Sequence, residues 1–260
     1  MNAATAPAAA PRVDLLRCYA LEAKLEFLRM LRTPAFVLPT LLFPPMFYLL
    51  FGVMLARGSS PGAYQPAVYL LATYNVFGVM APGLFGFGVT VALDRERGWH
   101  ALKRAMPMPP GAWLAAKLAM AMLFAAVIFA IMAVVAITFG GVELAPSAWA
   151  ILFALDLLGV LPFCAIGLFI GCVVDGQGAP AVANLVYLPM AFLSGLWFPL
   201  QFLPALVGDL APLWPAWHLG RLALAAVGQG ASTGSAGHVL ALVATTVLFL
   251  VLARWRLVRG

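Results

Sequence analysis

The segment from Asp94 to Pro110, DRERGWHALKRAMPMPP, holds the densest group of polar side chains between the two ends of the chain. Its apolar members are spaced as one face of a helix: Trp99, Leu102 and Met106. This pattern predicts a short amphipathic helix over about residues 94–108. Such a helix is suited to docking against another protein, and the alternative is a solvated loop whose basic residues only set membrane topology.

Single polar residues inside apolar segments form a second group of candidates. Asp156 stands between two leucines, and a carboxylate in such a segment is costly unless it faces protein or water. Asp156 is therefore expected either to contact a substrate, a cation or a proton, or to form a buried hydrogen bond or ion pair. The other candidates for substrate, gate or structural polar roles are Asn184, Ser194, Trp214 and His218.

For two of these candidates the residue types favour structural roles. Amides inside apolar helices most often join neighbouring helices, so Asn184 is expected to do so. His218, near Trp214 and Trp217, is expected to form a local hydrogen bond, and the alternative is that it lines an exit path.

Catalytic and cofactor motifs are weak or absent. The sequence contains no GxxxxGK[ST] phosphate loop, so any ATP that drives this protein must bind another polypeptide. The three cysteines form no CxxC pair, and neither a disulfide framework nor a zinc site is implied. An intramembrane serine protease using Ser194 would need a histidine on a neighbouring span and the usual Gly-x-Ser-x-Gly elbow, but position 192 is Phe.

Composition places these residues in a membrane. Only 9% of the 260 residues are charged and 64% are hydrophobic. A helix needs about 20 apolar residues to cross a hydrocarbon core of roughly 30 Å, and such runs recur along the chain. The fold class is therefore an all-α integral membrane protein without a soluble domain.

The apolar runs predict six transmembrane helices in a domain covering residues 34–260. The predicted spans are about residues 35–56, 67–93, 113–139, 148–174, 179–198 and 237–253, the second kinked near Pro82-Gly83. With this division every lysine and arginine except Arg57 and Arg221 lies on one side of the membrane. The positive-inside rule then places both termini in the cytoplasm.

Three further segments are not simple spans. Residues 1–11 form an Ala/Pro-rich tail expected to be disordered. Residues 12–33 mix apolar and charged side chains as an amphipathic helix in the membrane interface would. Pro34 should end that helix. Residues 199–230 are apolar but interrupted by prolines, which predicts half-helices re-entering the outer leaflet.

The order of these features resembles the permeases of the type-2 ABC (ABC-2) exporter family. Arg32-Thr33-Pro34 resembles the family's entry to the first span, and Asp94 to Gly98 resembles the stretch that ends the second. Ser194-Gly195 with Phe198-Pro199 resembles the end of the fifth span. In Leu213-Trp214-Pro215, Trp214 stands where the family usually has Asn.

The resemblance implies a function and partners. Such permeases pair with a second copy or a paralogue in the bacterial inner (plasma) membrane and bind two copies of a cytoplasmic ABC ATPase, which holds ATP and Mg²⁺. The segment 94–108 would be the coupling helix and residues 12–33 the connecting helix. The residues implied in ATPase coupling are Asp94, Arg95, Glu96, Arg97, Gly98, Trp99, Leu102 and Lys103.

The resemblance leaves the substrate open. The few charges favour a hydrophobic or amphiphilic substrate such as a drug, a lipid or a lipid-linked glycan. Besides lipid, no nucleic-acid or cofactor partner is expected for this chain. A membrane assembly or scaffold subunit without transport of its own is the alternative function.

Overall fold

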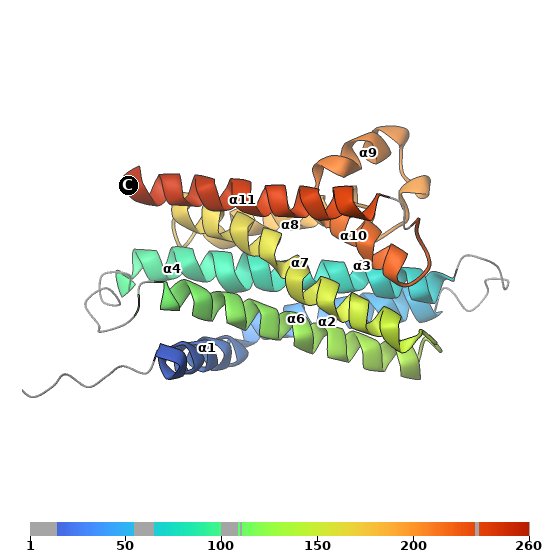
Figure 1. Ribbon diagram of the computed structural model, residues 1–260, viewed down its shortest axis with the longest axis horizontal. Coiled ribbons are helices and arrows are strands. Elements are labelled where there is room, and N and C mark those ends of the chain that lie inside the picture. Colours follow the sequence, from blue (N-terminus) through green and yellow to red (C-terminus); the bar gives the residue numbers. More distant parts are fainter. Residues whose placement is uncertain (1–14, 55–64, 100–108, 110, 232–233, 260) are drawn as a thin grey trace, which may run out of the picture.

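The computed structural model describes residues 15–54, 65–99, 109, 111–231 and 234–259. Every regular element within these ranges is helical, and most of the helices run along one long axis (Figure 1). The predicted tail (residues 1–11), Leu102 and Lys103 lie outside the described residues. An all-helical fold is therefore confirmed for the described part of the chain.

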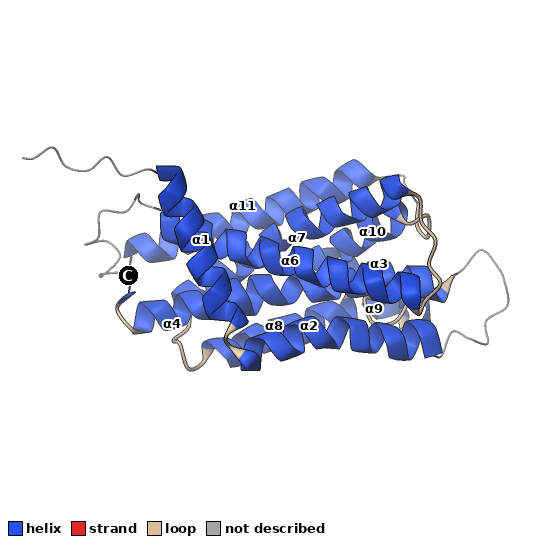
Figure 2. Ribbon diagram, turned by 90° about the horizontal axis from the view of Figure 1, so that it is seen from below, coloured by secondary structure: helices blue, strands red, loops and turns tan. Residues whose placement is uncertain are grey.

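The first helix, α1 (Leu15–Leu31), lies across the axis of the other helices at the end of the molecule that also holds the C-terminus (Figure 2). The chain turns at Thr33, and Pro34 begins α2 (Pro34–Phe47). Proline suits this first turn because its missing N–H needs no partner there. Helix α2 continues into the π-helical segment η1 (Tyr48–Met54).

The second apolar segment is the most buried helix of the fold. Helix α3 (Pro66–Ala81), the π-helical segment η3 (Pro82–Val89) and α4 (Thr90–Glu96) form one continuous rod. The predicted kink position at Pro82 is where the α-helical hydrogen-bond register changes to the wider π register. Of the most apolar window in this rod, 89% is buried inside the chain.

Close packing of this rod depends on glycine. A Cβ atom added to Gly88 would lie 2.5 Å from the Cα of Gly167, and one added to Gly83 would lie 2.7 Å from the Cβ of Phe163. Both neighbours belong to α7 (Pro146–Val173). The two helices approach most closely at Gly88 and Gly167, where neither has a side chain, a packing mode favoured between membrane helices.

Five helices are long and apolar enough to cross a membrane, counting only the described residues. Besides Pro34–Met54 and Pro66–Glu96, they are α6 (Ala112–Thr138), α7 and Ser235–Leu257, which belongs to α11 (Ser235–Arg259). The predicted fifth span, residues 179–198, is longer than the helix found there, because α8 covers only Ala179–Leu193. Its 15 residues span roughly 22 Å, and Gly195 ends the helix at φ +71°.

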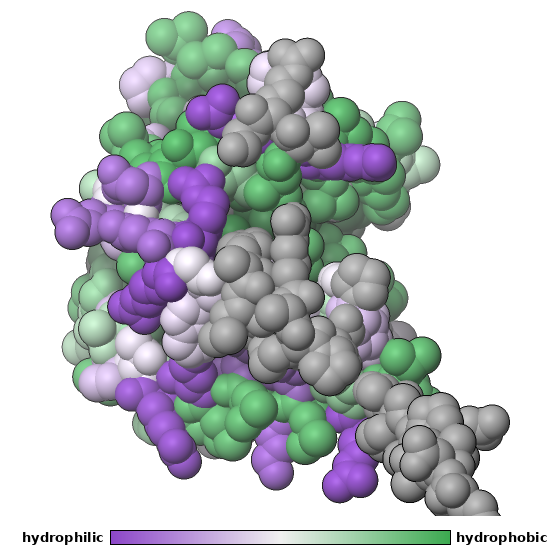
Figure 3. Space-filling model, turned by 90° about the vertical axis from the view of Figure 1, so that its left-hand side faces the viewer, coloured by the Kyte–Doolittle hydropathy of each residue, from purple (hydrophilic) through white to green (hydrophobic). Residues whose placement is uncertain are grey.

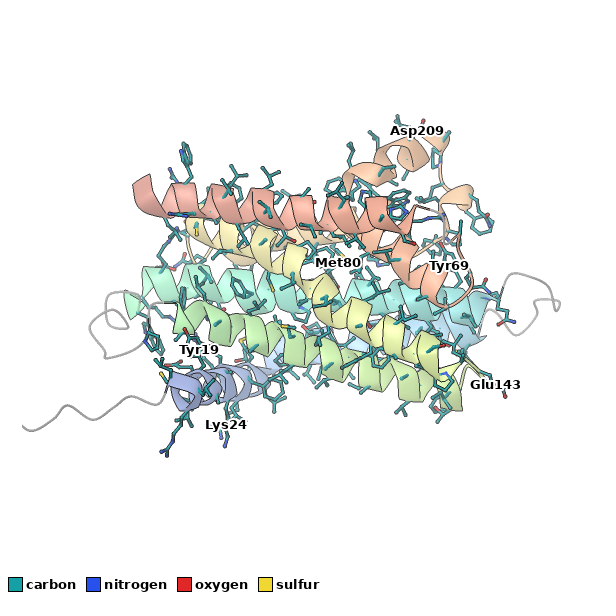
Figure 4. All side chains as sticks on the ribbon, viewed as in Figure 1. Tyr19, Lys24, Tyr69, Met80, Glu143 and Asp209 are labelled. Atoms are coloured by element: carbon teal, nitrogen blue, oxygen red, sulfur yellow. The ribbon has the colours of Figure 1, made fainter. Side chains whose placement is uncertain are left out.

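The segment after α8 consists of short helices that begin at or beside prolines. They are the 3₁₀ turns η4 (Leu200–Phe202) and η5 (Ala211–Leu213), and the helices α9 (Ala205–Leu210) and α10 (Pro215–Ala226). Figure 1 places α9 and α10 at the end of the molecule opposite α1. In Figure 4, Lys24 on α1 and Asp209 on α9 mark these two ends.

Candidate functional site

Four charged side chains meet where α1 crosses the ends of α4 and α6. We call Glu26, Arg29, Asp94 and Lys117 the buried ion-pair cluster. The exposed fraction of the side chain is 0% for Lys117, 1% for Asp94, 5% for Glu26 and 30% for Arg29. The cluster therefore forms part of the interior although it draws its charges from three different helices.

Lys117 lies at the centre of the cluster. Its Nζ is 2.8 Å from Asp94 Oδ2 and 3.4 Å from Glu26 Oε1. The same ammonium group donates a hydrogen bond of 2.9 Å to Thr90 Oγ1. Thr90 in turn donates to the carbonyl of Gly86 at 2.6 Å, so the polar chain ends on the helix backbone.

Arg29 brings α1 to the same carboxylate. Its guanidinium contacts both oxygens of Asp94, at 2.9 and 3.4 Å, and lies 3.6 Å from Glu26 Oε2. Partial burial works against the charged form of Arg29, but the hydrogen bond and the charges of Asp94 and Glu26 outweigh it and raise its pKa. Two cations therefore balance two anions, as a buried charged group requires.

The arrangement of the cluster suits a structural joint between helices and not a reaction site. All its carboxylates are occupied by ammonium or guanidinium partners, and its one amine, Lys117 Nζ, is held between two carboxylates. In the described part of the chain, no group of three histidine, cysteine or acidic residues is placed to hold a metal ion. The cluster instead ties α1 to α4 and α6, because separating any one helix would leave a buried charge unpaired.

Arg95 makes a second joint, between α4 and α7. Its guanidinium donates to the backbone carbonyls of Cys172 and, at 2.7 Å, Val174. A cation is favoured at a helix C-terminus because the last carbonyls lack partners within the helix. The neighbouring Glu96 is exposed, and its carboxylate lies against Gly176.

The turn after α4 is exposed and carries an aromatic side chain. The helix ends at Glu96 and Gly98 adopts φ +70°, so residues 94–96 belong to the second rod. Residues 100–108, most of the predicted docking helix, lie outside the described residues. Trp99 is 41% exposed, and the guanidinium carbon of Arg29 lies 5.3 Å from the centroid of its ring. This cation–π contact joins the surface of the turn to the buried ion-pair cluster.

The predicted coupling residues therefore divide into two kinds. Arg97, Gly98 and Trp99 are exposed together with Glu96. Asp94 is 1% exposed and cannot itself touch a partner, because its carboxylate is enclosed by Arg29 and Lys117. Leu102 and Lys103 lie outside the residues that the structure describes.

Asp156 and Asn184 form no side-chain hydrogen bond with the described residues. Asp156 on α7 is 0% exposed, and neither carboxylate oxygen has a hydrogen-bond partner among the described residues. Asn184 is exposed on α8, and the hydrogen bonds found within the described ranges do not use it to join helices of this chain. A helix-joining bond by Asn184 would have to reach another molecule.

The remaining candidates lie near the end opposite α1. Ser194 is buried after α8, and its Oγ has no hydrogen-bond partner among the described residues. Trp214 is half-buried and precedes α10. His218 pairs with His238, their Nδ1 atoms 2.9 Å apart, and its Nε2 lies 2.9 Å from the carbonyl oxygen of Pro212. The local hydrogen bond expected for His218 is present, whereas no described histidine activates Ser194.

Sequence reasoning missed the pairing of Glu26, Arg29 and Lys117. The charge distribution along the sequence counts Lys117 only as one of the basic residues on one side of the membrane, but it lies inside α6 and is fully buried. The available signal was its position within an apolar segment, where a charged residue requires a partner. Periodicity cannot identify that partner, since Glu26 and Arg29 are far from it along the chain.

Comparisons with known proteins identify the family of this chain. A family model described as ABC-2 type transporter matches residues 20–227. A Bacillus subtilis (strain 168) protein named "Putative transport permease YvfS" is 29% identical over 234 residues, which cover 88% of this chain and 93% of that relative. The match includes all four residues of the buried ion-pair cluster and both joints at the α1 end. The chain belongs to the ABC-2 type transporter family of membrane transport permeases.

Proposed function

We propose that this chain is the permease subunit of an ATP-driven exporter, powered by two copies of a separate cytoplasmic ABC ATPase that bind ATP and Mg²⁺. Membership of the ABC-2 family and the name of the bacterial relative support a role in transport. The proposed substrate is a hydrophobic or amphiphilic molecule such as a drug, a lipid or a lipid-linked glycan.

The observation that carries this proposal is the continuous path from Trp99 to the buried ion-pair cluster. An ATPase that pushes on the exposed turn around Trp99 would move Arg29 through their ring contact. Arg29 is joined to Asp94, and Asp94 to Lys117. A small displacement at the surface would thereby reach α1 and two membrane-crossing helices together.

The proposed topology has six spans with both termini in the cytoplasm of a bacterial inner membrane. In it α8 and the residues up to Phe198 form the short fifth span, and residues 199–230 re-enter the outer leaflet. The crosswise orientation of α1 suits a helix lying in the membrane interface (Figure 2). Hydrophilic side chains also gather on this end of the molecule (Figure 3), as a cytoplasmic face requires.

The proposal includes a second permease copy, or a paralogue, beside this one. Large apolar side chains on α2 and α8 are exposed in the single chain, including Leu38 (56%), Leu42 (54%) and Leu185 (73%). Asn184 shares the exposed part of α8 and would find a helix-joining partner there. A substrate path between the two copies would be lined by α2 and α8.

Affinity purification of the full chain from native membranes in mild detergent, followed by mass spectrometry, tests the partner. A P-loop ATPase recovered in about equal amount supports the proposal. A folded chain that brings down no ATPase would contradict it and favour the membrane assembly or scaffold subunit.

Exchange of Trp99 tests the coupling path once that ATPase is in hand. Trp99→Ala should lower ATP hydrolysis by the assembled complex while leaving membrane insertion intact. Trp255→Ala is the matched control, because Trp255 is 51% exposed and lies on α11 near the same end. Equal hydrolysis in both variants and the wild type would overturn the coupling role of Trp99.

A further inference from the structure

A cavity of about 290 Å³ opens at the end of the molecule opposite α1. It lies between α3, the residues that follow α8, and α10. Figure 4 shows Tyr69, one of its lining residues, at this end. The polar side chains that line it are Tyr69, Thr73, Ser194, Gln201, Arg221 and Gln229.

The charge of the cavity is positive. Among the described residues that line it, Arg221 is the only charged one and none is a carboxylate. Among the described residues, the ion pairs of the structure do not include Arg221. The acids of the described part at this end, Glu143 and Asp209, are exposed and do not line the cavity. A half-buried guanidinium without a protein carboxylate favours an anionic ligand.

Hydroxyl groups add hydrogen-bond donors to this charge. Ser194 is 5% exposed and its Oγ is buried without a partner among the described residues. Thr73 is 1% exposed, and the bond from its hydroxyl to the carbonyl of Leu70 is long, at 3.5 Å. Leaving a buried hydroxyl unsatisfied costs free energy, which a bound acceptor would recover.

The surroundings of the cavity suit a group at the depth of lipid headgroups. Trp217 lines it and is half-buried, and Trp197 and Trp214 are half-buried in the same region of the chain. Tryptophan is enriched where the hydrocarbon core meets the headgroups. Gly195 and Gly220 also line the cavity, and Gln201 in the lining is exposed.

We propose that this cavity binds the phosphate group of an amphiphile, with Arg221 as the charge partner and Ser194 and Thr73 as hydroxyl donors. Arginine with several neutral donors matches the spread charge of a phosphate better than that of a point anion. That the cavity faces the outer leaflet rests on the proposed topology, whereas phosphate binding itself does not. The phosphate could belong to a membrane lipid or be free in solution, and the test separates these two sources.

Native mass spectrometry of the purified full chain in detergent measures the binding. The probes are dioleoyl-phosphatidylglycerol, dioleoylglycerol, which has the same acyl chains without phosphate, and inorganic phosphate. We expect phosphatidylglycerol to bind at least tenfold more tightly than dioleoylglycerol. Displacement by inorganic phosphate alone at millimolar concentration would identify free phosphate as a ligand, and no displacement would identify the lipid.

Variants locate the site. Arg221→Gln should reduce phosphatidylglycerol binding at least tenfold, and Ser194→Ala about threefold. Arg254→Gln is the charge-matched control at the opposite end of the molecule and should change binding less than twofold. If Arg221→Gln does not fold, Arg221→Lys replaces it as the test, because it keeps the charge. Arg221→Lys should bind phosphatidylglycerol more weakly than wild type. The double variant Ser194→Ala with Arg221→Lys should bind it more weakly still.

Wild-type affinity in Arg221→Gln, or equal affinity for the two lipids, would overturn the proposal. The assay contains neither ATP nor an ATPase. Its failure would therefore leave the permease proposal standing, and a missing ATPase would leave phosphate binding unaffected.

Discussion

Lys117 shows how one buried charge fixes the geometry of a whole region. Its ammonium contacts two carboxylates from different helices, Glu26 at 3.4 Å and Asp94 at 2.8 Å. Neither carboxylate reaches bulk water in this arrangement. The loss of folding stability on replacing Lys117 therefore depends mainly on the two buried carboxylates that lose their ammonium partner.

Lys117→Met should destabilise the protein by about 3–5 kcal/mol, because it leaves two buried carboxylates with Arg29 as their only cation in the cluster. Thermal unfolding in detergent measures the change. Lys24→Met, at an exposed position on α1, is the control and should change stability by less than about 0.5 kcal/mol. A Lys117→Met variant as stable as the control would show that the cluster is not a joint.

The histidine pair predicts a dependence on pH. Burial lowers the pKa of His218, although the hydrogen bond to the carbonyl of Pro212 partly opposes this. Its ordinary value is 6.5, so the unfolded chain takes up protons first as the pH falls. The stability that His218 contributes is thus present above about pH 6.5 and is lost as the pH falls toward its lower folded pKa.

The charged and titratable groups that face this pair disfavour its protonation. Protonation of both imidazoles would set one N–H against another across the 2.9 Å contact of their Nδ1 atoms. Arg221 adds a further positive charge near His238, and the ring of Trp217 packs against both histidines. The melting temperature should therefore fall between pH 7.5 and 5 more steeply in wild type than in His218→Gln. Parallel curves would contradict the assignment.

At the scale of elements, the contact between η3 and α7 depends on the missing side chains of Gly88 and Gly167. Gly88→Ala would place a methyl group 2.5 Å from the Cα of Gly167, so the backbones must separate. Such overpacking costs about 1–3 kcal/mol. Gly208→Ala on α9 is the control, because a Cβ atom there meets nothing within 4 Å. Equal unfolding temperatures for these two variants would show that the close approach is dispensable.

The long apolar helices can be predicted from the sequence, whereas the buried contacts between charged side chains cannot. The sequence pattern located the apolar helices α3 to α4, α6, α7 and α11 because apolar length alone specifies them. It extended the fifth span past Leu193, since the residues up to Phe198 stay apolar and only backbone geometry at Gly195 ends the helix. The pairing of Arg29 with Asp94 joins residues 65 positions apart, and no local pattern carries that information.

At the scale of the whole molecule, the native cysteines test the proposed orientation. Cys18 on α1 is half-exposed, whereas Cys164 and Cys172 are buried. In intact cells a membrane-impermeant maleimide should label a Glu143→Cys variant at the opposite end but leave Cys18 unlabelled. Cys18 should react only after permeabilisation. Labelling of Cys18 in intact cells would reverse the assignment of the two faces.

The balanced charges of the buried ion-pair cluster also determine how the protein responds to voltage. Carrying one elementary charge through a potential of 100 mV requires about 2.3 kcal/mol. Glu26 and Asp94 cancel Arg29 and Lys117, and the ion pairs keep the four together. If α1, α4 and α6 shift as a unit during transport, this cluster contributes no gating charge, and its movement costs the same in an energised cell as in a depolarised one.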